Sequence, residues 1–520
     1  MTGADLSDRI GAVLAVDTEA NRRRVAADAE IIERELESGT FDNPQAIVGL
    51  EYEFYAVDTE TAALQRVPRR LLELIGFEKE LGLHNAEMTT SPQPLNEHGL
   101  RAQEAEVCAR LQAALEVTRI EGMRLVSDGA FTIPPAGETA TRYLTDSVER
   151  TVPVDGDERP VRLATNMSDA ARYHAMANTD TGVGARLEID APNVSLAADT
   201  VMPESLITSI QPHYQVPHAE DLPAYFTYAL RVAGPLLALG VNAPFFPPDL
   251  YDEGVSADEV LGEAWMDHRI SIFEGVLNAS GDGDGKVRFP RDLESVSEAV
   301  ERIATDDDLV PMPADSGGRF DDEFAHFRRK HGTYWRWVRP VFDGATRSAA
   351  NARIEFRPLS AQPTVRDTVA FQAALAGLLE SLPRLSHPVA DLPWERAREN
   401  FYAAARDGLA ADLAWITGDG AETDDTDALY DDLLTHAAEG LSSRGFGDDA
   451  VARYLYPLRR RVRQRTTPAR WKHGRATAAL DEGATLADAI TETQRAYVSR
   501  QAETLLEGSF ADWLETDEPV

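Results

Sequence analysis

Residues 46–57 read AIVGLEYEFYAV, a segment in which apolar and acidic side chains alternate. Every second residue from Val48 to Phe54 is apolar, and Glu51 and Glu53 lie between them. Successive side chains of a β-strand point to opposite faces, so this two-residue period predicts a strand with one core face and one acidic face. The two glutamates therefore share a face.

Helical and extended periods follow on both sides of this strand. The periodicity predicts helices over 18–38, 98–122, 222–241 and most of the chain from 364 onward, and strands over 187–190, 205–216 and 351–357. Residues 145–162 are rich in charge and proline, which predicts a loop or hairpin, and the acidic stretch 417–427 is a plausible hinge between helices. The fold class expected from this order is α+β, with a helical C-terminal third.

Three regions are expected along the chain. They are an N-terminal helical lead-in over 1–45, a catalytic core over 46–390 and a helical C-terminal region over 391–520. A length of 520 residues is more than one average domain needs, which agrees with one large core and a smaller companion.

The composition limits the possible partners and compartments. The formal net charge is −37, which makes binding to nucleic acid or to an anionic membrane surface unfavourable. The basic residues include few lysines, a bias that together with the acidity resembles proteins of halophiles that accumulate salt in the cytoplasm. Cys108 has no second cysteine to pair with. With no signal-like start and no apolar run of membrane-spanning length, the expectation is a soluble cytoplasmic protein.

The sequence contains neither a Walker phosphate loop nor a Rossmann glycine pattern. It offers polar pairs on predicted strands instead: Glu51 with Glu53, and Gln211 with His213. Crowded carboxylates on one strand face suit hard divalent cations, which bind oxygen ligands. The alternative is an ordinary solvated sheet face, and the same alternative applies to the Arg-x-Glu-x-Arg string at 353–357, which is also typical of a cross-strand salt ladder.

Taken together and in order, these segments resemble the GCS2 group of glutamate-cysteine ligases and related carboxylate-amine ligases. The matching segments are GLEYEF at 49–54, NAEMTTSP at 85–92, SIQPH at 209–213, RIEFR at 353–357 with the following QPT at 362–364, and a weaker match over 399–409. The resemblance implies a glutamine-synthetase-like fold, in which an antiparallel sheet curves into a half-open funnel with helices outside it.

The same resemblance implies ATP and Mg²⁺ as cofactors and gives roles to individual residues. The implied metal ligands are Glu51, Glu53, Glu87 and Glu355. The residues expected to bind nucleotide are Gln211, His213 and Arg336, and those expected to stabilise the transferring phosphoryl group or to bind the substrate carboxylate are Arg353, Arg357 and Arg339.

The implied reaction is ATP-dependent amide formation, with glutamate as the acid and cysteine as the amine. Two alternatives stay open at this point: the same chemistry with another amine, and a catalytically silent relative that binds an amino acid or a nucleotide. The sequence leaves the oligomeric state open.

Overall fold

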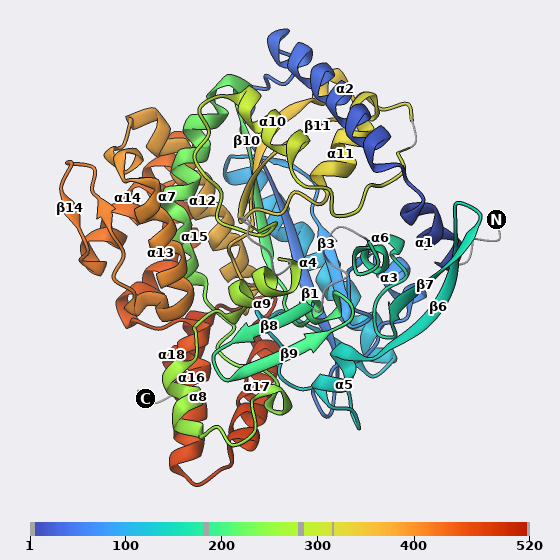
Figure 1. Ribbon diagram of the computed structural model, residues 1–520. Coiled ribbons are helices and arrows are strands. Elements are labelled where there is room, and N and C mark those ends of the chain that lie inside the picture. Colours follow the sequence, from blue (N-terminus) through green and yellow to red (C-terminus); the bar gives the residue numbers. More distant parts are fainter. Residues whose placement is uncertain (1–5, 180–186, 279–284, 315–316, 517–520) are drawn as a thin grey trace.

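The computed structural model describes residues 6–179, 187–278, 285–314 and 317–516 (Figure 1). Its centre is an eight-stranded sheet built around β1, the strand predicted from the alternating segment. The main path through the sheet is β11 (Val338–Asp343), β12 (Asn351–Phe356), β10 (Ile210–Val216), β1 (Ile47–Asp58), β3 (Asn85–Thr89) and β2 (Glu78–Lys79). Two further strands, β4 (Gln93–Pro94) and β5 (Met123–Val126), also pair with β1, and every pairing is antiparallel.

The two faces of the sheet differ in polarity because side chains alternate along each strand. On β1, Leu50, Tyr52 and Phe54 are buried, and Tyr52 donates its hydroxyl proton to the carbonyl of Gln362. Tyr214 of β10 points the same way and donates to Glu380 of α12 at 2.7 Å. This face therefore packs on helices, and the other face carries the glutamates.

Helices cover the apolar face and form most of the C-terminal third of the chain (Figure 1). In chain order they are α1 (Leu6–Leu14), α2 (Thr18–Glu37), α3 (Arg69–Ile75), α4 (Glu97–Ile120), α5 (Ala140–Thr145), α6 (Ala171–Met176), α7 (Leu222–Gly240), α8 (Ala257–Glu263), α9 (His268–Leu277), α10 (Val296–Thr305), α11 (Ala325–His331), α12 (Val365–Leu385), α13 (Trp394–Asp407), α14 (Thr426–Ser443), α15 (Asp448–Gln464), α16 (Pro468–Asp481), α17 (Leu486–Thr504) and α18 (Phe510–Thr516). The short turns between them are the 3₁₀ helices η1 (Met202–Leu206), η2 (Ala219–Asp221), η3 (Pro248–Leu250), η4 (Phe320–Phe324), η5 (Arg347–Ala349), η6 (Pro388–Asp391) and η7 (Gly408–Ala410).

The most apolar of these helices is part of the core. The segment Ala219–Gly240, which includes α7, is long and apolar enough to cross a membrane, with a mean hydropathy of 1.2. In the structure 78% of that apolar window is buried inside the protein, which is the behaviour of a core helix.

The predicted fold class and most of the predicted elements are confirmed. Residues 145–162 fall in a hairpin of β6 (Ser147–Val154) and β7 (Asp157–Ala164), and residues 187–190 belong to β8 (Leu187–Ala191), which pairs with β9 (Val194–Ala198).

The strand predicted to begin at Ser205 begins instead at Ile210. Its first residues belong to η1, where Pro203 opens the turn and the Ser205 hydroxyl donates back to the Met202 carbonyl at 2.7 Å. A proline at the start of a turn and a local side-chain bond both favour the turn over a strand.

The acidic stretch predicted as a hinge forms part of a small hairpin. Its strands are β13 (Trp415–Ile416) and β14 (Glu422–Thr423). Asp432 of α14 fixes the hairpin by accepting hydrogen bonds from the Trp415 indole at 2.8 Å and from the Gly418 amide at 2.9 Å.

The C-terminal helices pack on the same core as the sheet, and buried ion pairs join the two. Arg461 of α15 bonds to Asp367 at 2.8 Å, and Lys472 of α16 bonds to Asp128, which follows β5. Gln501 of α17 donates to the carbonyls of Ser127 and Pro363, at 2.6 and 2.9 Å. The late helices therefore hold segments from both ends of the core together.

Candidate active site

The polar face of the sheet gathers nearly all the residues singled out in the sequence, because the strand register places them opposite one another. Glu53 of β1 pairs with Glu87 of β3, and Glu51 pairs with Gln211 of β10. On the other side of β10, His213 pairs with Glu355 of β12. The sheet therefore brings residues from four strands into one row of polar side chains.

Carboxylates crowd one end of this row. Burial, followed by repulsion from Glu80, raises the pKa of Glu53 to about 7. Burial also raises the pKa of Glu87 well above its ordinary value, and repulsion from Glu51, Glu80 and Glu53 adds to the effect. Within the described residues neither Glu53 nor Glu87 forms an ion pair with an arginine or lysine. The carboxyl groups of this cluster therefore remain available to a bound cation.

Two members of the acidic cluster were not anticipated from the sequence. Glu80 follows β2 and faces Glu87, and Glu204 lies in η1. Burial and then repulsion from Glu80 raise the pKa of Glu204 to about 8. Neither residue lies on a strand with visible alternation. The available signal for Glu80 was its place just before the turn that leads into β3.

Gln211 links the acidic end of the row to the basic end. Its Nε2 atom donates to Oε1 of Glu53 at 2.9 Å, and its Oε1 atom accepts from Arg357 at 2.6 Å. The Ser209 amide and hydroxyl also donate to Glu53, at 2.7 and 3.0 Å. The carboxylate of Glu53 is therefore held in a fixed orientation by neutral donors.

Glu355 lies between two arginines. Its Oε1 atom accepts from Arg357 at 2.6 Å and lies 2.9 Å from Arg339. Burial by itself raises the pKa of Glu355, but the two guanidinium groups outweigh it and hold the pKa well below the ordinary value. Both arginines are largely buried, with side chains 14% and 12% exposed. Arg269 of α9 supports this end by donating to the carbonyl of Arg357 at 2.6 Å.

His213 is oriented by Arg353. The Arg353 Nε–H group donates to Nδ1 of His213 at 3.3 Å, so the neutral ring carries its proton on Nε2. That Nε2 atom lies 3.2 Å from Oε1 of Glu51, although the two are not aligned as a hydrogen bond. Arg353 itself forms a two-point ion pair with Asp343, at 2.5 and 2.8 Å.

Arg336 is the predicted site residue that does not join the row. Its guanidinium bonds to Asp306 at 2.6 Å and to the carbonyls of Lys286 and Trp335, and it stacks on the ring of Tyr334. These contacts connect loops outside the sheet, because Arg336 lies before β11 begins.

The arrangement can bind cations and phosphate groups side by side. Carboxylates at one end attract divalent cations, and buried guanidinium groups at the other end attract oxyanions. A polyphosphate bridged to metal ions needs both kinds of partner within one site.

Comparisons with known proteins agree with this geometry. The profile of "Glutamate-cysteine ligase family 2 (GCS2)" matches residues 47–500. No curated protein sequence matches the chain. The fold is similar to that of a glutamate–cysteine ligase from Francisella tularensis solved in complex with AMP, with a TM-score of 0.51, 14% identity, and coverage of 91% of this chain and 92% of that one.

Two further solved structures show weaker likeness. A bifunctional glutathione synthetase from Pasteurella multocida has a TM-score of 0.44 at 13% identity, with 92% of this chain and 55% of that chain covered. The ligase PafA, solved in complex with the prokaryotic ubiquitin-like protein Pup, has a TM-score of 0.36 at 12% identity, with 88% and 74% covered.

Proposed function

The chain belongs to glutamate-cysteine ligase family 2, and from this membership and the polar face of the sheet we propose that it is an ATP-dependent carboxylate-amine ligase. We propose glutamate as the acid and cysteine as the amine. The observation that supports this most directly is the row in which Glu53 and Glu87 lie at one end and Arg339 and Arg357 at the other.

The acidic cluster fits Mg²⁺. Its donors are carboxylate oxygens, which hard cations prefer, and within the described residues no arginine or lysine forms an ion pair with Glu53 or Glu87. We propose that Glu51, Glu53 and Glu87 hold the cations, with Glu80 beside them. Glu355 can still offer its Oε2 atom. Bound Mg²⁺ would neutralise phosphate charge that the arginines alone leave uncompensated.

The arginines would act on the phosphate being transferred. In the proposed reaction a glutamate carboxylate oxygen attacks the γ-phosphorus of ATP, ADP leaves, and an acyl phosphate forms. The amine then attacks the acyl carbon, phosphate leaves, and the amine loses a proton to give the amide. Arg339 and Arg357, fixed by Glu355 and Gln211, would stabilise the charge on the phosphoryl oxygens without having to reorganise.

His213 would act as a hydrogen-bond donor. Arg353 fixes the ring so that Nε2 carries the proton, and this atom faces the region of Glu51. In this tautomer the ring cannot ligate a metal through Nε2, so we propose that it donates to a phosphate oxygen.

The test is ADP release by the purified protein with Mg²⁺ and glutamate in the presence of a panel of amines, with the product identified by mass spectrometry. The proposal predicts that ADP forms only when acid and amine are both present, and that cysteine gives a γ-glutamyl amide. Turnover with another amine alone would correct the substrate and keep the reaction class. Nucleotide binding without turnover on any amine would favour the catalytically silent alternative.

A further inference from the structure

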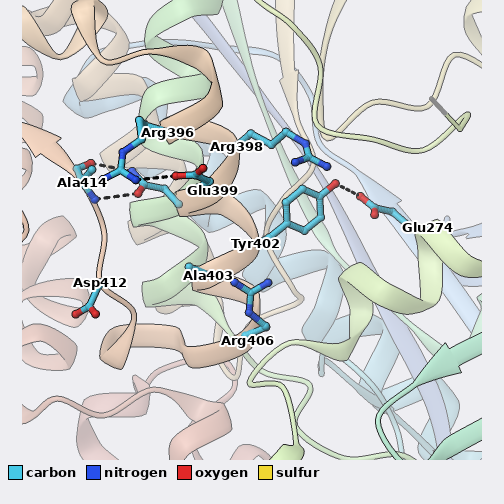
Figure 2. A pocket seen from close by; sticks show the side chains of 10 residues that line it. Glu274, Arg396, Arg398, Glu399, Tyr402, Ala403, Arg406, Asp412 and Ala414 are labelled. Atoms are coloured by element: carbon cyan, nitrogen blue, oxygen red, sulfur yellow. Dashed lines mark hydrogen bonds and ion pairs between the residues drawn. The ribbon is translucent and has the colours of Figure 1, made fainter. Parts of the chain in front are cut away.

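A second polar cavity lies on α13, apart from the funnel. Its volume is about 450 Å³, and it is lined mainly by α13 residues, with Glu274 from α9 and Asp412 from the loop that follows α13 (Figure 2). None of the residues that form the row on the sheet takes part in its lining. It also contains the one segment of the family resemblance, 399–409, that the proposed reaction does not use.

An alternating stripe of arginine and aromatic side chains runs along this face of α13. Arg398, Tyr402 and Arg406 are four residues apart, so they lie above one another on the helix, as Figure 2 shows. The Arg398 guanidinium lies 5.0 Å from the centre of the Tyr402 ring, and Arg406 lies 5.9 Å from a ring of Trp265. Stacking on aromatic rings orients both guanidinium groups and leaves their N–H donors available.

The positive charge of this stripe is only partly compensated, because Glu274 attracts Arg398 without forming an ion pair with it. Within the described residues, neither Arg398 nor Arg406 forms an ion pair, although the chain as a whole has 88 acidic and 51 basic residues. Two of the three carboxylates that line the cavity are engaged elsewhere. Glu399 pairs with Arg396 at 2.8 Å, and Glu274 accepts from the hydroxyl of Tyr402 and the indole of Trp337, both at 2.7 Å.

We propose that this cavity binds a small acidic amino acid, or a short peptide that contains one. Two guanidinium groups and the exposed carboxylate of Asp412 complement two carboxylates and one ammonium group. Guanidinium groups bind carboxylates through paired hydrogen bonds, which gives the site its selectivity for planar anions.

The cavity is also connected to the arginines of the funnel. Tyr402 and Trp337 share the Glu274 Oε1 atom, and the Trp337 carbonyl accepts from the amide of Arg357 at 2.8 Å. A ligand that moved Tyr402 would therefore act on the strand that carries Arg339. This gives the site a route for regulating the enzyme.

The test is equilibrium dialysis of the full-length protein with radiolabelled L-glutamate, counting sites per chain, with inorganic phosphate and L-lysine as competitors. The variants are the double substitution Arg398→Ser/Arg406→Ser and, as control, Arg384→Ser, which removes an exposed arginine of α12 that does not line the cavity. We expect the double variant to lose one site, with binding weakened at least tenfold. The control should bind like the wild type, and L-lysine should not compete.

Several outcomes would overturn the proposal. Unchanged site numbers in the double variant would show that these arginines bind no amino acid. Displacement of the bound glutamate by an equal concentration of inorganic phosphate would replace the amino acid with a phosphate ligand. One further outcome separates the two proposals. If the wild type binds a single glutamate and the double variant binds none, the cavity on α13 is supported and glutamate binding on the polar face of the sheet is contradicted.

Discussion

This protein has two groups of carboxylates, one buried in the core and one half-buried on the sheet, and among the described residues only the first group is paired with basic side chains. In the core, Asp367 has Arg461 as its partner and Asp128 has Lys472, and the side chains of all four are at most 4% exposed. On the polar face of the sheet, no basic side chain in the described part of the chain is bonded to Glu53 or Glu87. A buried charge costs free energy unless it is paired, so paired carboxylates can serve the structure alone. The unpaired cluster fits the cation site proposed for it, whereas the paired carboxylates need no ligand.

The largest expected effect comes from breaking the paired side of this comparison. Replacing Lys472 with Met leaves Asp128 buried without its cation, which should lower the free energy of unfolding by about 3–5 kcal/mol. Urea unfolding of the wild type and the variant measures this difference in free energy. The matched control is Arg495→Met, because Arg495 pairs with Glu492 in an exposed contact worth at most about 1 kcal/mol. Equal losses of unfolding free energy in both variants would show that the buried pair is no more stabilising than the exposed one.

On the unpaired side, Glu53→Gln should remove activity and spare the fold. Loss of one fixed anionic ligand should lower kcat by about 10²–10³-fold, as loss of one preorganised electrostatic group does elsewhere. The melting temperature without Mg²⁺ should stay the same or rise, because repulsion with Glu87 is relieved. A large drop in melting temperature together with normal turnover would show that Glu53 is structural.

The basic end of the row should respond more weakly. Arg357→Lys keeps the charge but cannot reach Gln211 and Glu355 with one planar group, and charge-assisted bonds of about 1.5–3 kcal/mol should weaken. We expect kcat/KM to fall about ten- to a hundredfold with ATP or glutamate varied, and little change with the amine. Arg23→Lys, at an exposed contact with Glu19, serves as control. Near-normal constants for the Arg357 variant would take this strand out of the reaction.

The smallest expected effect is a dependence of folding stability on pH, which we expect Mg²⁺ to abolish. Glu53 has a pKa of about 7 in the folded protein against an ordinary value of 4.5, so the folded state binds more protons between these values. Without metal, stability should therefore fall as pH rises from 4.5 to 7 and then level off. The size is at most about 1.4 kcal/mol per pKa unit, reduced because the group is partly exposed.

Melting temperatures at pH 5.5 and 8, in EDTA and in Mg²⁺, measure this dependence. The Glu53→Gln variant corrects for the rest of the acidic surface. A slope that persists in this variant would assign the effect to other carboxylates.

The sequence predicted the parts of this protein that depend on local periodicity. The alternation in 46–57 was sufficient for β1 and for the shared face of Glu51 and Glu53, and the structure confirms both. Residues without such a pattern were missed: Glu80 lies after a two-residue strand and Glu204 in a turn. The resemblance also placed Arg336 with the nucleotide-binding residues, but its contacts lie outside the sheet.

The paired carboxylates could not be predicted from sequence patterns, for a different reason. Lys472 and Asp128 are 344 positions apart, and no period connects them. Only the packing of α16 against the loop after β5 brings them together. The family resemblance covered the row on the sheet, but it said nothing about which carboxylates have partners.

The bonds of Gln501 to Ser127 and Pro363 also affect how the protein is made. A ribosome that adds about 5–20 residues per second takes about 15–60 s to synthesise the 300 or so residues between β1 and β12. The helix that holds Gln501 emerges later still. During that time the edge of β1 that pairs with β10 stays uncovered until residue 210 is made, and α7 is made before the helices α12 and α13 that pack on it. Protection of these surfaces during synthesis is therefore a requirement of this topology.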